Sequence, residues 1–194
     1  MIGRRGFTRT LAAALLAVSV ACVHAPLPAQ SATAAPTVIL VIRHAEKQGD
    51  PAAMTADPAL TPEGVERAGA LVPATRHLAL AAVYSTQYVR TRETARPAAE
   101  AAGVTVTVRP VDGRTAATYA PDLAAHLLAQ HAGRTVLVVG HSNTVPAIVK
   151  ALSGRDVGTI PDERYGDLFT VIIPAGATPS AAQPATVVVS RIGR

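Results

Sequence analysis

Cysteine is almost absent from the 194-residue chain, in which Cys22 is the only one. A single cysteine excludes an intramolecular disulfide scaffold and a metal site built from several thiolates. Tryptophan is absent, and the remaining aromatic residues are four tyrosines and two phenylalanines. Because 49% of the residues are nevertheless hydrophobic, we expect a core made of many small aliphatic contacts.

Acidic residues are missing from the N-terminal region, where Glu46 is the first one. Arg4, Arg5 and Arg9 supply three of the five net positive charges, so the rest of the chain carries only +2. Proteins that bind nucleic acid usually present a concentrated basic surface. The charge balance therefore argues against nucleic acid as a partner.

The first 35 residues have the composition of an export signal followed by a linker. A positive segment precedes the apolar segment Leu11–Val23, and small residues at Ala29–Ser31 and Ala32–Ala34 offer cleavage sites. The apolar segment is shorter than the ~20 residues that a membrane-spanning helix needs. We therefore expect residues 1–35 to direct export to the periplasm or the medium, and residues 36–194 to form one domain.

The export route has several alternatives. Arg4 and Arg5 resemble a twin-arginine motif, although Gly3 stands where serine or threonine is usual. Cys22 offers a site for a lipid anchor, but Ser19 replaces the aliphatic residue that is usual in a lipoprotein signal. An uncleaved amphipathic anchor is the remaining alternative.

Short apolar strands alternate with helical segments over the rest of the chain. We expect strands over 37–42, 81–85, 104–108, 135–139, 168–173 and 186–192. Helices are expected over 61–76, 87–102, 121–132 and 144–152. This alternation predicts an α/β fold, a three-layer αβα sandwich with a mainly parallel sheet and helices on both faces. The last two strands have no helix between them, which predicts an antiparallel edge strand.

Several small or capping residues carry local predictions. Thr61 can cap the first helix, and Pro62 suits its first position. Gly64 and Gly69 lie inside this helix, where they either weaken it or mark close packing on the sheet. Gly140 is expected to let the backbone turn sharply after its strand.

Two histidines follow buried strands. His44 comes after strand 37–42, and His141 comes after strand 135–139. Ligands of open α/β sheets bind at the carboxyl ends of the strands. The positive charge of Arg43 lowers the pKa of the adjacent imidazole, which keeps a nitrogen lone pair free. We therefore expect His44 to attack a phosphate.

Further residues can contact the phosphate. His141 is expected to donate a hydrogen bond to the transferring phosphoryl group. Arg90 falls in the first turn of helix 87–102, where free N–H groups favour an anion and a guanidinium can hold two phosphate oxygens. Ser142 and Asn143 are either substrate contacts or caps of the next helix.

These residues lie in four segments that follow one another along the chain: Arg43-His44-Ala45-Glu46, Leu60-Thr61-Pro62-Glu63-Gly64, Thr86-Gln87-Tyr88-Val89-Arg90-Thr91-Arg92-Glu93-Thr94-Ala95 and Val139-Gly140-His141-Ser142. The four segments resemble, in the same order, motifs of the histidine phosphatase superfamily, also called the phosphoglycerate mutase-like family. Thr86 and Gln87 stand where that family usually has serine and proline.

The resemblance implies a chemistry for these residues. His44 would be the nucleophile that becomes phosphorylated, and water would then hydrolyse the phosphohistidine. Arg43, Arg90 and His141 would complete the phosphate pocket. The resemblance implies no metal and no organic cofactor.

A proton donor should also be present, because a poor leaving group departs with a proton. The resemblance implies an acidic residue after the third strand, which makes Asp112 the first candidate. Asp112 beside Gly113 also has the pattern of a simple turn. The alternatives are Glu46, which is close to His44, and the Asp162-Glu163 pair in a late loop.

The predicted function is a phosphatase that hydrolyses small phosphate monoesters, or phosphohistidine, through a phosphohistidine on His44. A phosphomutase is the first alternative, but a mutase generally needs lid segments to shield its intermediate from water. A metal-dependent hydrolase with His44, Glu46 and His141 as ligands is the second, although two nearby arginines would repel a dication. A non-catalytic protein that binds phosphorylated ligands is the third.

Overall fold

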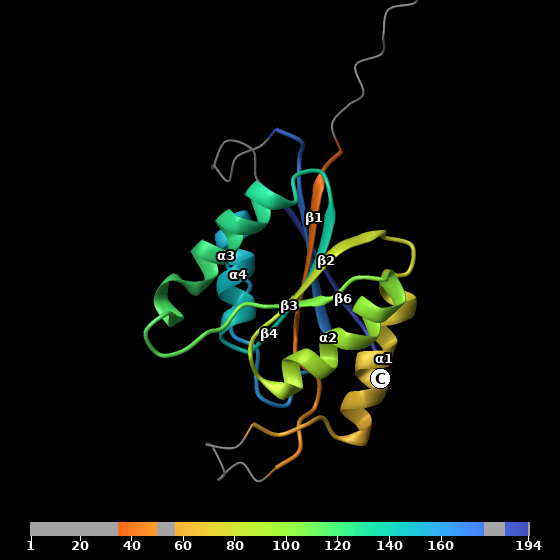
Figure 1. Cartoon of the computed structure of the whole chain (residues 1–194). Coiled ribbons are helices and arrows are strands. Elements are labelled where there is room, and N and C mark those ends of the chain that lie inside the picture. The colour runs from red at the N-terminus through yellow and green to blue at the C-terminus, as the bar shows by residue number, and fades with distance from the viewer. Residues whose placement is uncertain (1–34, 50–56, 177–184, 194) are drawn as a thin grey trace, which may run out of the picture. The chain divides into compact units, whose positions relative to one another are not determined.

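A six-stranded sheet lies at the centre of the described domain (Figure 1). The structure is a computed structural model that describes residues 35–49, 57–176 and 185–193. The expected export signal lies outside these described residues. The strands are β1 (Thr37–Arg43), β2 (Leu80–Ser85), β3 (Val106–Val108), β4 (Thr135–Gly140), β5 (Asp167–Ile173) and β6 (Thr186–Arg191).

The strand order is β3-β2-β4-β1-β5-β6. β1, β2, β3 and β4 pair in parallel, whereas β5 is antiparallel to β1 and β6 is antiparallel to β5. This arrangement confirms the predicted α/β fold with a mainly parallel sheet. It also confirms that the last two strands pair antiparallel at one edge.

Four helices cover the two faces of the sheet: α1 (Pro62–Thr75), α2 (Val89–Ala102), α3 (Ala116–Gln130) and α4 (Thr144–Ser153). Figure 1 shows α3 and α4 on one side and α1 and α2 on the other. Within the described part of the chain, no helix is long and apolar enough to cross a membrane.

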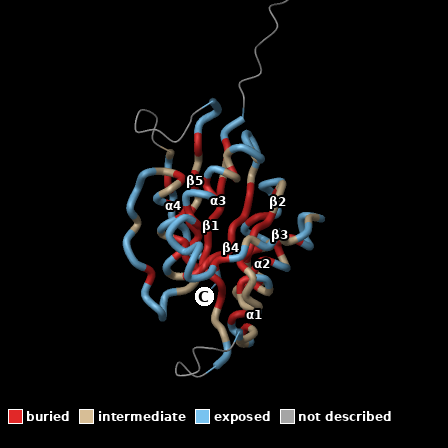
Figure 2. Tube along the Cα trace, turned by 60° about the vertical axis from the view of Figure 1, so that its left-hand side comes forward, coloured by how far each residue is buried: buried red, intermediate tan, exposed pale blue. Residues whose placement is uncertain are grey.

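Alternate residues of the central strands belong to two separate apolar clusters. Ile39 and Val41 pack with residues of α3 and α4, whereas Leu40 and Ile42 pack with residues of α1 and α2. All four side chains are at most 1% exposed, and β1 and β4 form the buried centre of Figure 2. Burial on both faces explains why these strands are continuous apolar runs.

Helix α3 corrects one predicted boundary, because it begins at Ala116 and not at Pro121. Tyr119 and Ala120 are buried, so packing stabilises the turn that precedes the proline. A proline inside a helix loses the hydrogen bond of its own N–H, and its ring crowds the carbonyl four residues earlier, so burial of this turn must outweigh both costs. Tertiary packing therefore decides a boundary that the proline alone would place later.

Helix α1 begins as predicted, and its two glycines differ in their surroundings. The Thr61 hydroxyl accepts a hydrogen bond from the Gly64 amide at 3.1 Å, and Pro62 is the first helical residue. A Cβ atom at Gly64 would lie 2.2 Å from the carbonyl oxygen of Glu46, whereas a Cβ at Gly69 would meet nothing within 4 Å. Gly64 thus permits close packing of α1 against the segment after β1.

The two glycines give a matched pair of stability variants. Gly64→Ala should lower the free energy of unfolding by about 1–3 kcal/mol, because its methyl group overpacks against backbone. Gly69→Ala should raise the same free energy by about 0.5–1 kcal/mol, because alanine favours the helix. Urea unfolding of both variants measures these changes, and equal effects at the two positions would contradict the packing described for Gly64.

Candidate active site

The two histidines meet because their strands are neighbours. Parallel pairing of β1 and β4 places Arg43 opposite Gly140, and the His44 amide donates to the Gly140 carbonyl at 2.9 Å. The ring centroids of His44 and His141 are 5.4 Å apart, with an angle of 66° between the rings. The predicted juxtaposition of the two histidines is therefore present in the structure.

A cavity of about 720 Å³ opens at these strand ends. It brings together most of the side chains proposed from the sequence: Arg43, His44, Arg90, Asp112, His141, Ser142, Asn143 and Asp162. It is also lined by Lys47, Tyr88 and Val111, for which the sequence motifs predicted no role. Three cationic side chains beside two imidazoles make the cavity suitable for an anionic ligand.

The hydrogen bond of His44 determines which of its nitrogens can react. Nδ1 lies 2.7 Å from the carbonyl oxygen of Ala45. Since a carbonyl oxygen only accepts, Nδ1 must carry the proton of the neutral ring. Nε2 then keeps a free lone pair and is the nitrogen available for attack.

Burial keeps His44 neutral. Burial of the ring is the largest cause that lowers the pKa of His44 to about 3. Repulsion from His141, when that ring is protonated, and from Arg90 and Arg43 adds smaller contributions. From the sequence we attributed the lowered pKa of His44 to Arg43, which is only a minor cause. The pKa of His141 is lowered to about 4, again mainly by burial and then by the two arginines.

Arg43 is held by the loop that precedes β5. Its Nη1 donates to the carbonyl oxygens of Pro161 and Asp162, each at 2.9 Å, and of Arg164 at 3.2 Å. Its guanidinium also lies 4.2 Å from the centre of the Tyr165 ring. The side chain also lines the cavity, and its Nε atom is buried without a partner among the described residues.

Arg90 lies in the first turn of α2, as predicted. Its guanidinium stacks on the Tyr88 ring at 4.3 Å, and its Nε is buried without a partner among the described residues. The carboxylate of Asp57 accepts from the Val89 amide at 2.8 and 3.0 Å and lies 3.5 Å from Arg90 Nη1. An acidic side chain therefore lies at the helix N-terminus where we predicted an anion.

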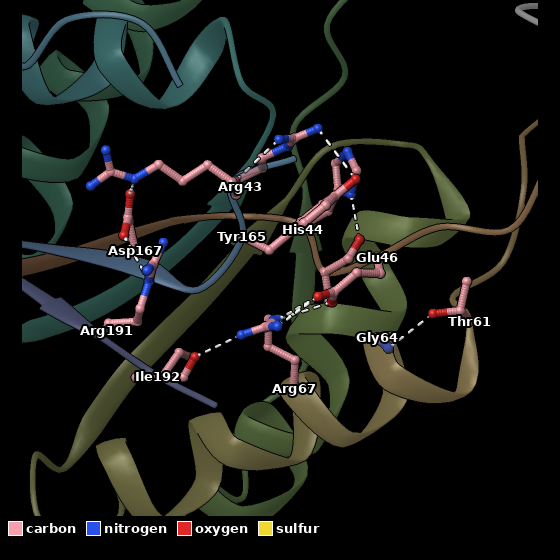
Figure 3. Close-up of polar contacts among 12 residues, drawn as sticks. Arg43, His44, Glu46, Thr61, Gly64, Arg67, Tyr165, Asp167, Arg191 and Ile192 are labelled. Carbon is pink, nitrogen blue, oxygen red and sulfur yellow. Dashed lines mark hydrogen bonds and ion pairs between the residues drawn. The ribbon is translucent and has the colours of Figure 1, made fainter. Parts of the chain in front are cut away.

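Glu46 is not directed into the cavity. Figure 3 shows its carboxylate facing Arg67 of α1, which donates to it from Nε at 2.9 Å and from Nη2 at 2.6 Å. Among the described residues, no group of three histidine, cysteine or acidic side chains is arranged to hold a metal ion. The alternative ligand set of Glu46 with the two histidines is thus not assembled.

The other acidic candidates are at the rim or outside. Asp112 lines the cavity, but its carboxylate accepts from the amides of Arg114 at 2.8 Å and Thr115 at 3.0 Å. These hydrogen bonds lower the pKa of Asp112, which favours the turn over the proton donor. The Asp162 side chain is 89% exposed, and Glu163 does not line the cavity.

Gly140 is required for space and not for a sharp turn. Its backbone is outside the left-handed region, but a Cβ at this position would lie 2.6 Å from the hydroxyl of Thr144. That hydroxyl accepts from the His141 amide at 2.8 Å. The glycine therefore lets α4 begin directly against the end of β4 and fixes the backbone of His141.

The comparisons agree with this geometry. Residues 39–111 match the family model described as histidine phosphatase superfamily (branch 1). Over these residues the chain is similar to the histidine phosphatase superfamily. No curated protein sequence matches it.

Solved structures of several phosphatases share the fold at low sequence identity. A mycobacterial glucosyl-3-phosphoglycerate phosphatase is 14% identical, with a TM-score of 0.60 over 80% of this chain and 98% of that one. A protein from Nakamurella multipartitia, assigned as the phosphohistidine phosphatase SixA, is 24% identical, with a TM-score of 0.55 over 82% and 98%. A phosphoserine phosphatase from Entamoeba histolytica is 16% identical, with a TM-score of 0.54 over 81% and 98%.

The lowered pKa values predict how stability depends on pH. As the pH falls below 6.5, the unfolded chain takes up protons that folded His44 and His141, with pKa values of about 3 and about 4, do not. Each histidine should therefore reduce the free energy of unfolding by about 1.4 kcal/mol per pH unit in this window. Urea unfolding between about pH 6 and pH 4.5 measures this dependence. The free energy of unfolding of the His44→Gln/His141→Gln double variant should change less with pH than that of the wild type. The same pH dependence in both proteins would mean that neither histidine is kept neutral by the fold.

Proposed function

We propose that this domain is a phosphatase that hydrolyses phosphate monoesters or phosphohistidine through a phosphohistidine formed on Nε2 of His44. The observation that carries the proposal is the convergence of His44, His141 and two arginines on one cavity. A neutral imidazole with one free nitrogen supplies the nucleophile. The guanidinium groups supply the fixed positive charge that a transferring phosphoryl group requires.

The first chemical step is the transfer of the phosphoryl group. The Nε2 lone pair of His44 forms a bond to phosphorus while the bond from phosphorus to the ester oxygen breaks. The leaving oxygen takes the electron pair of that bond and then a proton. As the ring becomes cationic, the hydrogen bond from Nδ1 to the Ala45 carbonyl strengthens and stabilises it.

The second step regenerates the enzyme. Water attacks the phosphorus of the phosphohistidine and loses a proton to solution, while the N–P bond breaks and its electron pair returns to Nε2. Inorganic phosphate then leaves. We expect Arg43 and Arg90 to hold the non-bridging oxygens through both steps, because both side chains line the cavity.

Small phosphorylated molecules are the proposed substrates. The cavity of about 720 Å³ is much larger than a phosphate group, so it has room for an attached organic group. Tyr88 and Val111 give it an apolar wall, and Lys47 adds a third cation. The related structures named above are described as phosphatases of a glycosyl phosphoglycerate, of phosphohistidine and of phosphoserine, which supports this substrate class.

The nucleophile can be tested with p-nitrophenyl phosphate. His44→Ala should reduce kcat at least about 10³-fold, because it removes the group that forms the intermediate. His77→Ala is the matched control, since His77 is an exposed histidine that does not line the cavity, and it should leave the rate unchanged. Undiminished turnover by a folded His44→Ala protein would exclude the proposed mechanism.

The same assay separates the alternative functions. Stoichiometric release of inorganic phosphate is expected, whereas a phosphomutase would return the phosphoryl group to an acceptor. An unchanged rate after treatment with EDTA is expected, whereas a metal-dependent hydrolase would lose activity. Binding of phosphate without turnover would leave the non-catalytic function as the better interpretation.

Asp112→Asn tests the proton donor. Because hydrogen bonds from the backbone keep the Asp112 carboxyl ionised, we expect this variant to slow alkyl and aryl phosphates by the same small factor. A true proton donor would matter far more for the alkyl ester, whose leaving group is poorer. The measurement compares the loss of rate on an alkyl phosphate with the loss on an aryl phosphate. A selective loss on the alkyl ester would identify Asp112 as the acid.

We also propose that the protein is exported and acts in the periplasm or outside the cell. Support comes from the sequence alone, namely the arginines of the N-terminal segment and the apolar run Leu11–Val23. Attachment of a lipid at Cys22 remains the less favoured form of this proposal. Mass spectrometry of the mature protein would identify the cleavage site and any lipid.

A further inference from the structure

A chain of buried hydroxyl groups leads away from His141. β2 pairs with β4 so that Ser85 lies opposite Val139, which brings the next residue, Thr86, beside His141. The Thr86 hydroxyl is 2.9 Å from Nε2 of His141 and 2.9 Å from the hydroxyl of Thr91. Both threonines are fully buried. The chain continues to the carbonyl oxygen of Tyr88, which is 2.8 Å from the Thr91 hydroxyl.

The end of this chain fixes the direction of its hydrogen bonds. A carbonyl oxygen only accepts, so the proton between Thr91 and Tyr88 must belong to the Thr91 hydroxyl. A hydroxyl has one proton, and Thr91 must therefore accept from Thr86. The proton of Thr86 is used in that bond, so Thr86 in turn accepts from Nε2–H of His141.

The opposite direction is less favourable. Thr91 would donate to Thr86, and Thr86 would donate to His141 Nε2. The Thr91 oxygen would then face the Tyr88 carbonyl oxygen at 2.8 Å with no proton between them. This arrangement makes one hydrogen bond fewer and places two lone pairs in repulsive contact inside the core.

We propose that Thr86 and Thr91 are positioning residues that hold the proton of neutral His141 on Nε2 and leave the lone pair of Nδ1 directed to the cavity. Nδ1 has no hydrogen-bond partner among the described residues, but it is not one of their fully buried atoms. The His141 ring lines the cavity. The proposal rests on the phosphatase function proposed above. It changes the role predicted for His141, because a neutral ring in this state cannot donate to the phosphoryl group.

A consequence is that the reactive complex contains one additional proton. This proton lies between His141 Nδ1 and a phosphoryl oxygen, and it arrives either on the phosphate monoanion or from solution. Placing the proton there forms only its hydrogen bond between Nδ1 and the phosphoryl oxygen. The second pKa of a phosphate ester is about 6, so kcat/KM should fall about tenfold per pH unit above that value.

The direct test is ¹⁵N NMR of the histidine rings in the wild-type protein near neutral pH. The chemical shifts should show His141 with Nε2 protonated and Nδ1 unprotonated. A protonated Nδ1 in the neutral ring would overturn the proposal. This measurement needs no turnover, so it separates a failure of the proposal from a failure of the phosphatase function.

Variants of Thr86 connect the tautomer with the activity. Thr86→Val keeps the shape but removes the acceptor, so kcat should fall about tenfold, as expected for one unmade buried hydrogen bond, with little change in KM. The His141 ring should then show a mixture of tautomers. Thr86→Ser retains the hydroxyl and should restore both the rate and the single tautomer, a rescue that a role confined to packing would not produce.

A matched control removes a buried threonine hydroxyl elsewhere. Thr75 is buried in α1, where its hydroxyl donates to the Leu71 carbonyl at 2.7 Å. Thr75→Val should leave kcat and the His141 tautomer unchanged. Equal effects of Thr75→Val and Thr86→Val, with an unaltered His141 spectrum in both, would contradict the proposal. If Thr86→Val does not fold, the wild-type spectrum and Thr86→Ser still decide it.

Discussion

Parallel pairing of β1 with β4 is the constraint on which the site depends. The register places Arg43 opposite Gly140, so His44 and His141 leave the sheet side by side. A shift of this register by one residue would turn every side chain of β1 to the other face and separate the histidines. Two apolar clusters, one on each face of the strands, hold the register in place. Core packing and the position of the reactive groups are therefore one feature of the fold.

Burial at this edge also determines the electrostatics. Removing the imidazoles from water lowers the pKa of His44 to about 3 and of His141 to about 4, so both rings are neutral. The Ala45 carbonyl then decides which nitrogen of His44 is free. Backbone carbonyls of the loop before β5 orient Arg43 in a similar way. The site is thus organised largely by main-chain atoms, and side-chain carboxylates contribute little to its centre.

Much of this arrangement could be predicted from the sequence, because it follows from periodicity and from strand ends. The apolar runs before His44 and His141 indicated the strands, and the Thr61-Pro62 pair indicated the start of α1. The start of α3 could not be predicted, since it depends on the burial of Tyr119. The position of Asp57 against Arg90 and the contact of Thr86 with His141 also depend on tertiary approach, which no local pattern encodes.

The structure corrected the role expected for Gly140 and changed the reason for the low pKa of His44. Gly140 is needed because a side chain would collide with Thr144, and the pKa of His44 is low mainly because the ring is buried. The proposed reaction depends above all on the covalent intermediate on His44. This intermediate can be tested by mass spectrometry of the protein quenched rapidly during turnover of a phosphate monoester. A phosphoryl group is expected on the peptide that contains His44. An unmodified peptide, or a phosphoryl group on another residue, would contradict it.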